Sequence, residues 1–306
     1  MNVFVTGVSG QLGYDVVKEL LSRGYAVVGS DIAENEKSVL LGETAKGTAS
    51  YEFAILDITD EVAVEVLLRR AEPDVVVHCA AWTAVDAAEE AENIEKVKAV
   101  NVIGTRNIAT ACKALDCKMI YVSTDYVFDG QGGMPWTADS TEYVPLSVYG
   151  RSKLDGELAV KELLTKYFIV RTAWAFGLNG TNFVKTMLAL GKKYDTLRVV
   201  SDQIGTPTYT LDLARLLVDM AETEKYGCYH ATNEGGYISW YEFACEIFKQ
   251  AGYETKVIPV TTEEYGLSKA KRPFNSRLDK SKLVEAGFKL LPEWMDALER
   301  YLKEIM

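Results

Sequence analysis

The sequence predicts an α/β fold, a doubly wound parallel sheet with helices on both faces and a smaller C-terminal lobe. Two observations support this prediction. Short, nearly all-apolar segments alternate with helical patterns along the first half of the chain, which is typical of parallel strands buried on both faces. Glycines also recur at a fixed spacing where the first of these segments meets the first helix. The 306 residues suffice for one large or two ordinary domains.

The composition narrows the class of protein. With 48% hydrophobic and 25% charged residues, the chain is typical of a globular protein. Its net charge of -11 argues against binding to nucleic acid or to an anionic membrane, and no apolar run reaches the roughly 18 residues of a membrane span. The N-terminus shows no signal-peptide pattern, and the 5 cysteines and 2 histidines form no metal-type cluster. We therefore expect a cytoplasmic protein without a metal site, either a monomer or a homodimer.

The first predicted strand, Asn2–Thr6, leads into a glycine loop and a helix. Gly7, Gly10 and Gly13 follow the spacing G-x-x-G-x-x-G, a variant of the dinucleotide-binding fingerprint of Rossmann-like folds. Glycine allows a tight turn, a close approach of the backbone to a pyrophosphate and close packing of helix on strand, with the anion at the helix N-terminus. The sequence therefore predicts a dinucleotide site at this loop.

The next strands end in residues suited to the same cofactor. Tyr25–Ser30 leads to Asp31, whose carboxylate can accept hydrogen bonds from the adenosine ribose; no Arg or Lys follows directly, so Asp31 favours NADH. Tyr51–Leu56 leads to Asp57 and Ile58, which we expect beside the adenine.

Between these two strands, Glu34–Ser50 is interpreted as a surface excursion that can include a short helix, with an apolar piece at Val39–Leu41. After the second of them, Thr59 or Asp60 is expected to cap the following helix.

Two further buried strands are predicted, Asp74–Cys79 and Lys118–Val122. Small residues after the first, up to Thr83, let the chain pass close to a cofactor. In the helical region between them Asn101 lies off the apolar stripe. It either positions a water or a lysine, or makes a helix–helix hydrogen bond. Residues 123–126 follow the strand Lys118–Val122 and should therefore lie at the carboxyl edge of the sheet, where ligands bind in such folds.

Tyr149 and Lys153 are four positions apart at the predicted start of a helix, which places them on one face. A phenol has a pKa of about 10, and an adjacent ammonium favours its ionised form. The pair therefore predicts a general acid with a lowered pKa, unless it is one of the many chance pairs on surface helices.

The glycine loop, the strand-end Ser/Thr and Tyr-x-x-x-Lys, in this order, resemble an extended short-chain dehydrogenase/reductase. Further motifs resemble more closely the dTDP-4-dehydrorhamnose reductase family. These motifs are Gly10-Gln11-Leu12-Gly13, Thr83-Ala84-Val85-Asp86, Ser123-Thr124-Asp125-Tyr126-Val127-Phe128, Arg171-Thr172-Ala173-Trp174 and Arg272-Pro273-x-Asn275-Ser276.

The resemblance implies reduction of the C4 ketone of dTDP-4-dehydro-L-rhamnose to dTDP-L-rhamnose with NADPH or NADH. The implied catalytic set is Thr124, Tyr149 and Lys153. Implied cofactor contacts, besides the residues above, are Gln11, Leu12, Ala81, Trp82, Thr83, Tyr149 and Lys153. Implied contacts with the dTDP-sugar are Val85, Thr124, Asp125, Tyr149 and Trp174. Dehydratases of the superfamily resemble one another because an Asp-Glu pair follows the Ser/Thr. Here Tyr126 follows Asp125, which favours simple reduction of a carbonyl over dehydration.

The second half is expected to form the substrate lobe. Trp174 fits either stacking on a sugar or a place in the core. Residues 268–282 are locally basic, and we expect solvated lysines. Arg272, fixed by Pro273, is predicted to bind the substrate diphosphate, and Asn275 is predicted as a further substrate contact. Residues 238–251 are predicted as a helix capped by Ser239 with aromatic residues in the core. We expect residues 1–172 to be mainly cofactor-binding and 173–306 mainly substrate-binding, with some segments returning to the sheet.

Two alternatives stay open at this stage. One is another sugar-nucleotide reductase or epimerase of the same superfamily. The other is non-enzymatic, since the family resembles a cofactor-binding regulatory subunit of methionine adenosyltransferase. The complete Thr–Tyr–Lys set weighs against the second.

Overall fold

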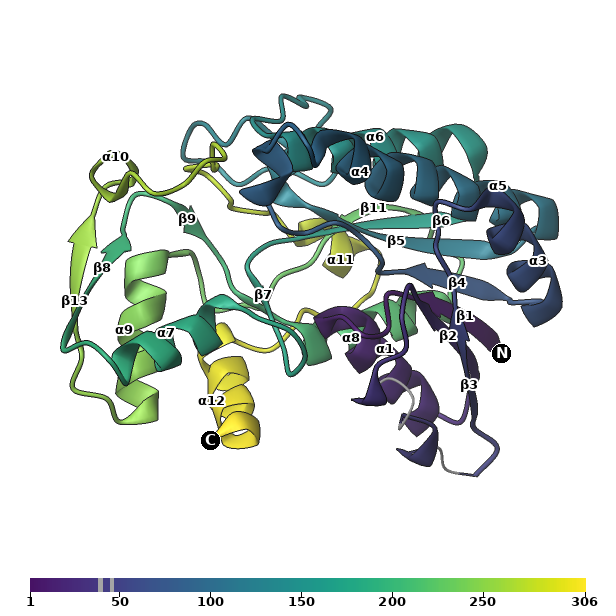
Figure 1. The fold of residues 1–306 in the computed structure, drawn as a ribbon, viewed down its shortest axis with the longest axis horizontal. Helices are drawn as coiled ribbons and strands as arrows, with labels where there is room; N and C mark the ends of the chain where they lie inside the picture. Colours follow the sequence, from purple (N-terminus) through teal and green to yellow (C-terminus); the bar gives the residue numbers. More distant parts are fainter. Residues whose placement is uncertain (38–40, 45–46) are drawn as a thin grey trace.

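The larger part of the molecule is a parallel sheet, seen in a computed structural model that describes residues 1–37, 41–44 and 47–306 (Figure 1). Its seven strands follow the order β11-β6-β5-β4-β1-β2-β3, and every pairing is parallel. The strands are β1 (Asn2–Thr6), β2 (Ala26–Asp31), β3 (Ser50–Ile55), β4 (Val75–His78), β5 (Lys118–Thr124), β6 (Tyr167–Thr172) and β11 (Gly227–His230). The strand order reverses between β1 and β4, and such a switch point opens a crevice at the carboxyl ends. The predicted doubly wound parallel sheet is confirmed.

Helices cover both faces of this sheet (Figure 1). Alternate residues of each central strand face opposite layers: Phe4 packs with α3, α5 and α6, whereas Val3 and Val5 pack with α1 and α8. The helices of the two layers and the short helices beside them are α1 (Gln11–Ser22), α3 (Glu61–Ala71), α4 (Ile94–Lys98), α5 (Thr105–Leu115), α6 (Val148–Leu163), α8 (Thr210–Ala221) and α11 (Ser281–Glu285). Both faces of the central strands are therefore buried, which explains their nearly all-apolar sequences.

Two local expectations concern the helix starts and the excursion before β3. The predicted cap of α3 is Asp60, whose Oδ1 accepts from the Ala63 amide at 3.0 Å. In the excursion, Leu41–Thr44 form a short 3-10 helix and Leu41 is buried. Val39, with the rest of residues 38–40 and 45–46, lies outside the described residues.

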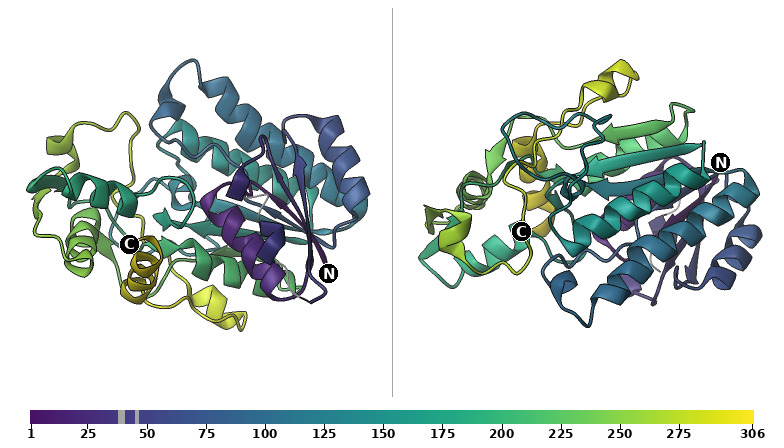
Figure 2. Two further views of the ribbon diagram at one scale, coloured as in Figure 1. Left: turned by 60° about the horizontal axis from the view of Figure 1, so that its bottom comes forward. Right: turned by 90° about the horizontal axis from the view of Figure 1, so that it is seen from above.

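A smaller lobe lies beyond one end of the sheet (Figures 1 and 2). Its aromatic core includes Phe176, Tyr209, Phe243 and Tyr301. Its elements are α7 (Phe183–Gly191), α9 (Trp240–Ala251), α10 (Thr262–Tyr265), α12 (Trp294–Ile305) and short sheets that pair β7 (Ala175–Phe176) with β10 (Thr208–Tyr209), β8 (Thr196–Val200) with β13 (Lys256–Val260), and β9 (Ile204–Gly205) with β12 (Ile238–Ser239). α9 begins at the predicted cap, where Ser239 and Glu242 form a capping box.

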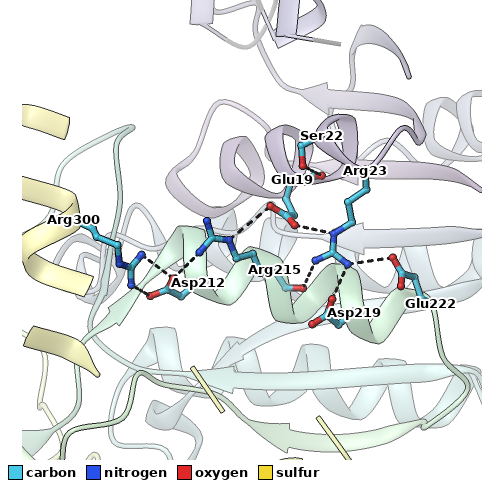
Figure 3. Close-up of polar contacts among 8 residues, drawn as sticks. All are labelled: Glu19, Ser22, Arg23, Asp212, Arg215, Asp219, Glu222 and Arg300. Carbon is cyan, nitrogen blue, oxygen red and sulfur yellow. Dashed lines mark hydrogen bonds and ion pairs between the residues drawn. The ribbon is translucent and has the colours of Figure 1, made fainter. Parts of the chain in front are cut away.

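Charged side chains join α1, α8 and α12 (Figure 3). Asp212, whose side chain is fully buried, accepts two hydrogen bonds from the Arg300 guanidinium, at 2.9 and 2.6 Å. Arg215 lies 3.4 Å from Asp212 and 3.9 Å from Glu19, so it bridges α8 and α1. Arg23 at the end of α1 then contacts Asp219 of α8 at 2.6 Å. The network connects the C-terminal helix, through α8, to the helix that follows the glycine loop.

No helix in the described part of the chain is long and apolar enough to cross a membrane.

Candidate active site

The glycine loop after β1 has room for backbone only. Gly7 has φ +72°, and a Cβ on it would lie 2.7 Å from the Ala80 amide nitrogen. A Cβ on Gly13 would lie 2.2 Å from the Gly7 carbonyl oxygen. Asp31 at the end of β2 accepts a hydrogen bond from the Ser9 amide at 2.9 Å, so its carboxylate is held against the loop. This cradle at the start of α1 fits the pyrophosphate and ribose of a dinucleotide.

A cavity of about 810 Å³ opens from this loop along the carboxyl ends of the strands. It extends from the end of β2 to the ends of β5 and β6 and on to the lobe. The predicted residues that line it are Gly7, Gly10, Gln11, Leu12, Gly13, Asp31, Asp57, Ile58, Ala81, Trp82, Thr83, Val85, Thr124, Asp125, Tyr149, Lys153 and Trp174. Arg272 and Asn275 are absent from its lining. A single cavity thus combines the predicted cofactor, catalytic and sugar residues.

Tyr149 lies in the first turn of α6, which Ser147 caps by accepting from the Gly150 amide at 3.1 Å. Burial raises the pKa of Tyr149 above its ordinary value; Asp125 and Tyr126 add to this rise, while a hydrogen bond with Thr124 opposes it. We expected Lys153 to lower the pKa of Tyr149. That expectation is wrong for the chain on its own, because burial is the dominant influence on the phenol.

Lys153 lies one turn further along α6 and is also buried. Its Nζ donates to the Val122 carbonyl at 2.8 Å and lies 4.1 Å from the centre of the Tyr121 ring. Burial lowers the pKa of Lys153 to about 7, although the Glu157 carboxylate opposes the change. The amine is thus poised between its charged and neutral forms near neutral pH.

Thr124 and Asp125 lie at the end of β5, and both are buried. The Thr124 hydroxyl donates to Asp125 Oδ1 at 3.0 Å. Burial raises the pKa of Asp125 to about 6, while hydrogen bonds with Ser276 and Thr124 oppose this rise. A carboxyl group and a hydroxyl thus lie at the strand edge where a substrate carbonyl would enter.

A buried ion pair supports this edge from behind. Glu157 and Arg171 have no exposed side-chain surface and contact each other at 2.7 Å. Glu157 lies one turn after Lys153 on α6, and it accepts a hydrogen bond from Ser123 at 2.6 Å. The pair therefore joins α6 to the ends of β5 and β6.

Asn101 joins the loop after β4 to α6. It lies in a π-helical turn, Ala99–Gly104, between α4 and α5. Its Oδ1 accepts from the Trp82 amide at 2.8 Å, and its Nδ2 donates to the Trp82 carbonyl at 3.1 Å and to Ser152 Oγ at 2.9 Å. Of the alternatives considered for Asn101, these contacts favour an interhelical hydrogen bond, which also fixes Trp82 at the cavity.

Arg272 lies outside the cavity, behind Tyr126. Its guanidinium pairs with Asp86 and donates to the Tyr126 hydroxyl at 3.2 Å. Tyr126 itself lines the cavity and packs edge-on against Tyr149, with ring centres 5.6 Å apart. The guanidinium is thus already paired within the chain, and its predicted contact with a diphosphate stays a prediction.

Asn275 fixes a surface loop. Its Nδ2 donates to the carbonyls of Gln131 and Met134, and its Oδ1 accepts from Arg277. Several lysines of the basic segment 268–282 form ion pairs, Lys269 with Glu90, Lys280 with Glu234 and Lys282 with Asp139. The basic segment is therefore held across the molecule by carboxylates of other elements.

Trp240 lines the cavity beside Trp174, a role that the sequence analysis missed. Of the other aromatic residues of α9, Phe243 and Phe248 are buried in the lobe, as predicted, whereas Tyr241 is only partly buried. Trp240 is the first residue of α9, directly after the Ser239 cap. Its position at the helix start was the available signal, because an end residue can face away from the core that the rest of the helix contacts.

The described residues contain no group of three or more His, Cys, Asp or Glu side chains placed to hold a metal ion.

Residues 1–306 match the family described as RmlD substrate binding domain. The chain is 39% identical to a dTDP-4-dehydrorhamnose reductase of Aggregatibacter actinomycetemcomitans, over 97% of each chain. The crystal structure of a dTDP-4-dehydrorhamnose reductase from Clostridium acetobutylicum has a TM-score of 0.88 and 40% identity, covering 100% of this chain and 99% of the other. That of a dTDP-4-dehydrorhamnose reductase from Bacillus anthracis, in complex with NADP, has a TM-score of 0.86 and 38% identity, covering 99% and 98%.

Proposed function

The chain belongs to the RmlD substrate binding domain family, and from this membership we propose that it is an NAD(P)H-dependent dTDP-4-dehydrorhamnose reductase. It would reduce the C4 ketone of dTDP-4-dehydro-L-rhamnose and release dTDP-L-rhamnose. One observation carries this proposal: a single cavity joins a glycine cradle to Thr124, Tyr149 and Lys153. The resemblance to this family that the motifs indicated is confirmed by the match over the whole chain.

The residues that would hold the cofactor extend over the ends of four strands. The glycine loop would hold the pyrophosphate, Asp31 the adenosine ribose, and Asp57 and Ile58 the adenine. Ala81, Trp82 and Thr83 would line the nicotinamide side, with Lys153 on its ribose. We propose that residues 1–172 bind mainly the cofactor, whereas residues 173–306 mainly complete the substrate site.

The bound dinucleotide supplies the hydride that reduces C4. Negative charge then develops on the carbonyl oxygen, where Tyr149 donates a proton and Thr124 donates a hydrogen bond. Burial raises the pKa of Tyr149, so its phenol is protonated at neutral pH and can give its proton to the more basic alkoxide. Lys153 holds the cofactor ribose and orients the reacting groups.

The proposed cofactor is either NADH or NADPH. Asp31 favours NADH because its carboxylate would repel a 2′-phosphate. The relative from Bacillus anthracis was crystallised with NADP. Localisation in the cytoplasm stays a prediction that the free cysteines support.

The first test is an assay of NADH and NADPH oxidation with a panel of dTDP-, GDP- and UDP-ketosugars. We expect turnover with dTDP-4-dehydrorhamnose. Preference for a GDP- or UDP-sugar would favour another reductase of the superfamily, and cofactor binding without turnover would favour a regulatory subunit.

Substitution of the proton donor tests the mechanism. Tyr149→Phe is expected to lower kcat by about 10²–10⁴-fold, because it removes the acid and leaves the cavity walls intact. Its affinity for NADPH, measured by fluorescence titration, should stay close to that of the wild type. Tyr229→Phe is the matched control, since the Tyr229 hydroxyl donates to the Lys225 carbonyl away from the cavity. Unchanged turnover in Tyr149→Phe would exclude this mechanism.

A further inference from the structure

Trp174 has an unusual backbone conformation. It follows β6 at the cavity, and its φ of +50° lies in the left-handed region, which is unfavourable for a bulky residue. The neighbouring backbone is anchored: the Thr208 amide donates to the Trp174 carbonyl at 3.2 Å, and the Thr208 hydroxyl donates to the Ala173 carbonyl at 2.7 Å. Strained residues persist where surrounding contacts over-determine them, and they concentrate at functional sites.

The side chain of Trp174 is held as firmly as its backbone. The Trp240 ring stacks on it, with ring centres 3.7 Å apart and planes inclined by 16°. Gly205 leaves room for the indole, since a Cβ there would lie 3.0 Å from it. Trp240 also packs against Phe183, with ring centres 4.5 Å apart. The lobe thus holds the Trp240 ring stacked on the Trp174 ring at the cavity.

The two indoles differ from the lobe core in their exposure. Both are only partly buried and both line the cavity, whereas Phe243 of the same helix is fully buried. Trp240 is also the first residue of α9, between the two residues of the capping box, Ser239 and Glu242. A flat, apolar wall therefore faces the cavity that Thr124, at the end of β5, and Tyr149, at the start of α6, also line.

We propose that Trp240 is a positioning residue, which holds Trp174 in its left-handed conformation so that the paired indoles form the wall against which the sugar ring of the substrate packs. The C–H face and the 6-methyl group of a 6-deoxyhexose suit an indole surface. This inference rests on the proposed reductase function. It assigns Trp240 to the binding of the sugar, and gives it no role in the binding of the dinucleotide.

The test replaces Trp240 and separates the binding of the two ligands. In Trp240→Leu and Trp240→Met the stacked ring is lost, and we expect KM for the dTDP-ketosugar to rise about tenfold or more. The Kd of NADPH should remain within about twofold of the wild type. Trp240→Phe retains a ring that can stack and should recover most of the loss in KM.

Two further measurements show whether the geometry is responsible. Closely stacked indoles couple their electronic transitions, so the wild type should show a Trp–Trp exciton couplet in circular dichroism that disappears in Trp240→Phe and Trp174→Phe. Trp294→Phe is the matched control, because Trp294 is buried in the same lobe and packs edge-on against Phe243. It should lower the Tm without changing KM.

The outcomes are distinguishable. If the wild type turns over the ketosugar and a folded Trp240→Leu or Trp240→Met keeps the wild-type KM, the positioning role is overturned and the reductase function stands. If KM and the Kd of NADPH rise together, Trp240 supports the fold of the whole site, and the specific role is likewise overturned. If the wild type reduces no ketosugar, the proposed function fails and this inference fails with it.

Discussion

Burial moves the pKa values of Tyr149 and Lys153 in opposite directions, and in both cases it favours the neutral form. The phenol keeps its proton at neutral pH, as a proton donor must. The amine, in contrast, has a pKa of about 7, more than three units below the ordinary value of about 10.4. Near neutral pH Lys153 is therefore divided between its charged and neutral forms, and this has a measurable effect on stability.

The pH dependence of folding should reveal this lysine. Between pH 7 and 10 Lys153 is protonated in the unfolded chain but neutral in the folded chain. Because the unfolded state binds more protons in this range, Lys153 makes the free energy of unfolding rise with pH. Below pH 7 the folded chain carries a buried ammonium. Lys153→Met should therefore be more stable than the wild type at pH 6, by on the order of a few kcal/mol, and this difference should shrink towards pH 9.

Urea denaturation of both proteins without cofactor, from pH 6 to pH 9, measures the difference, and the titration of groups that do not interact with Lys153 cancels between them. A difference that does not vary with pH would show that Lys153 titrates outside this window.

At the scale of elements, the start of α7 joins the lobe to the cofactor loop. Asn182 caps α7 by accepting from the Lys185 amide at 3.0 Å. Its Nδ2 lies 3.0 Å from Gln11 Oε1, 2.9 Å from the Gly177 carbonyl and 3.0 Å from the Tyr301 hydroxyl. One side chain thus connects the glycine loop, α7 and α12. The position of Gln11 in the cavity therefore depends on the lobe as well as on its own helix.

This connection can be removed without removing the cap. Asn182→Ser keeps a good capping residue, but its side chain is too short to reach Gln11. We expect the Kd of NADPH to rise about 2–10-fold, as for the loss of one hydrogen bond. Thr186→Ala is the matched control, because Thr186 is exposed on the same helix and its hydroxyl donates to the Asn182 carbonyl, at 2.9 Å, rather than to Gln11. Equal affinities of both variants, measured by fluorescence titration, would contradict the role of this contact.

At the scale of the whole molecule, the charged network of Figure 3 joins the C-terminal helix α12 to α8 and α1, which pack on the sheet. The Asp212 carboxylate is fully buried, and Arg300 of α12 is its bidentate partner. Arg215 and Asn233 also contact Asp212, at 3.4 and 2.9 Å. A buried carboxylate that loses its main partner is costly, although the remaining contacts reduce the cost.

Arg300→Met should lower the free energy of unfolding by about 1–3 kcal/mol. Lys303→Met on the same helix is the control: Lys303 pairs with Glu299 at the surface, and we expect less than about 1 kcal/mol. Urea denaturation measures both. An equal effect of the two substitutions would show that the buried carboxylate does not depend on Arg300.

The features that could be predicted from the sequence are those that depend on neighbours in the chain. Apolar runs mark the strands, glycine spacing marks the loop at Gly7, and the ends of parallel strands meet at one edge of a sheet. For these reasons the glycine loop, Asp31, Thr124 and Tyr149 could be assigned to one site before the structure was known.

The tertiary structure alone decided what depends on distant partners. Trp240 reaches the cavity because the lobe packs α9 against Trp174, 66 positions away, and no local pattern encodes that contact. Arg272 pairs with Asp86 because folding brings this carboxylate to it. The protonation of Tyr149 and Lys153 depends on desolvation, which is set by all the elements that surround them. The sequence by itself therefore determined the sheet, the glycine loop and the residues that the strand ends bring to one cavity, whereas the indole pair at that cavity and the charge state of the site required the folded chain.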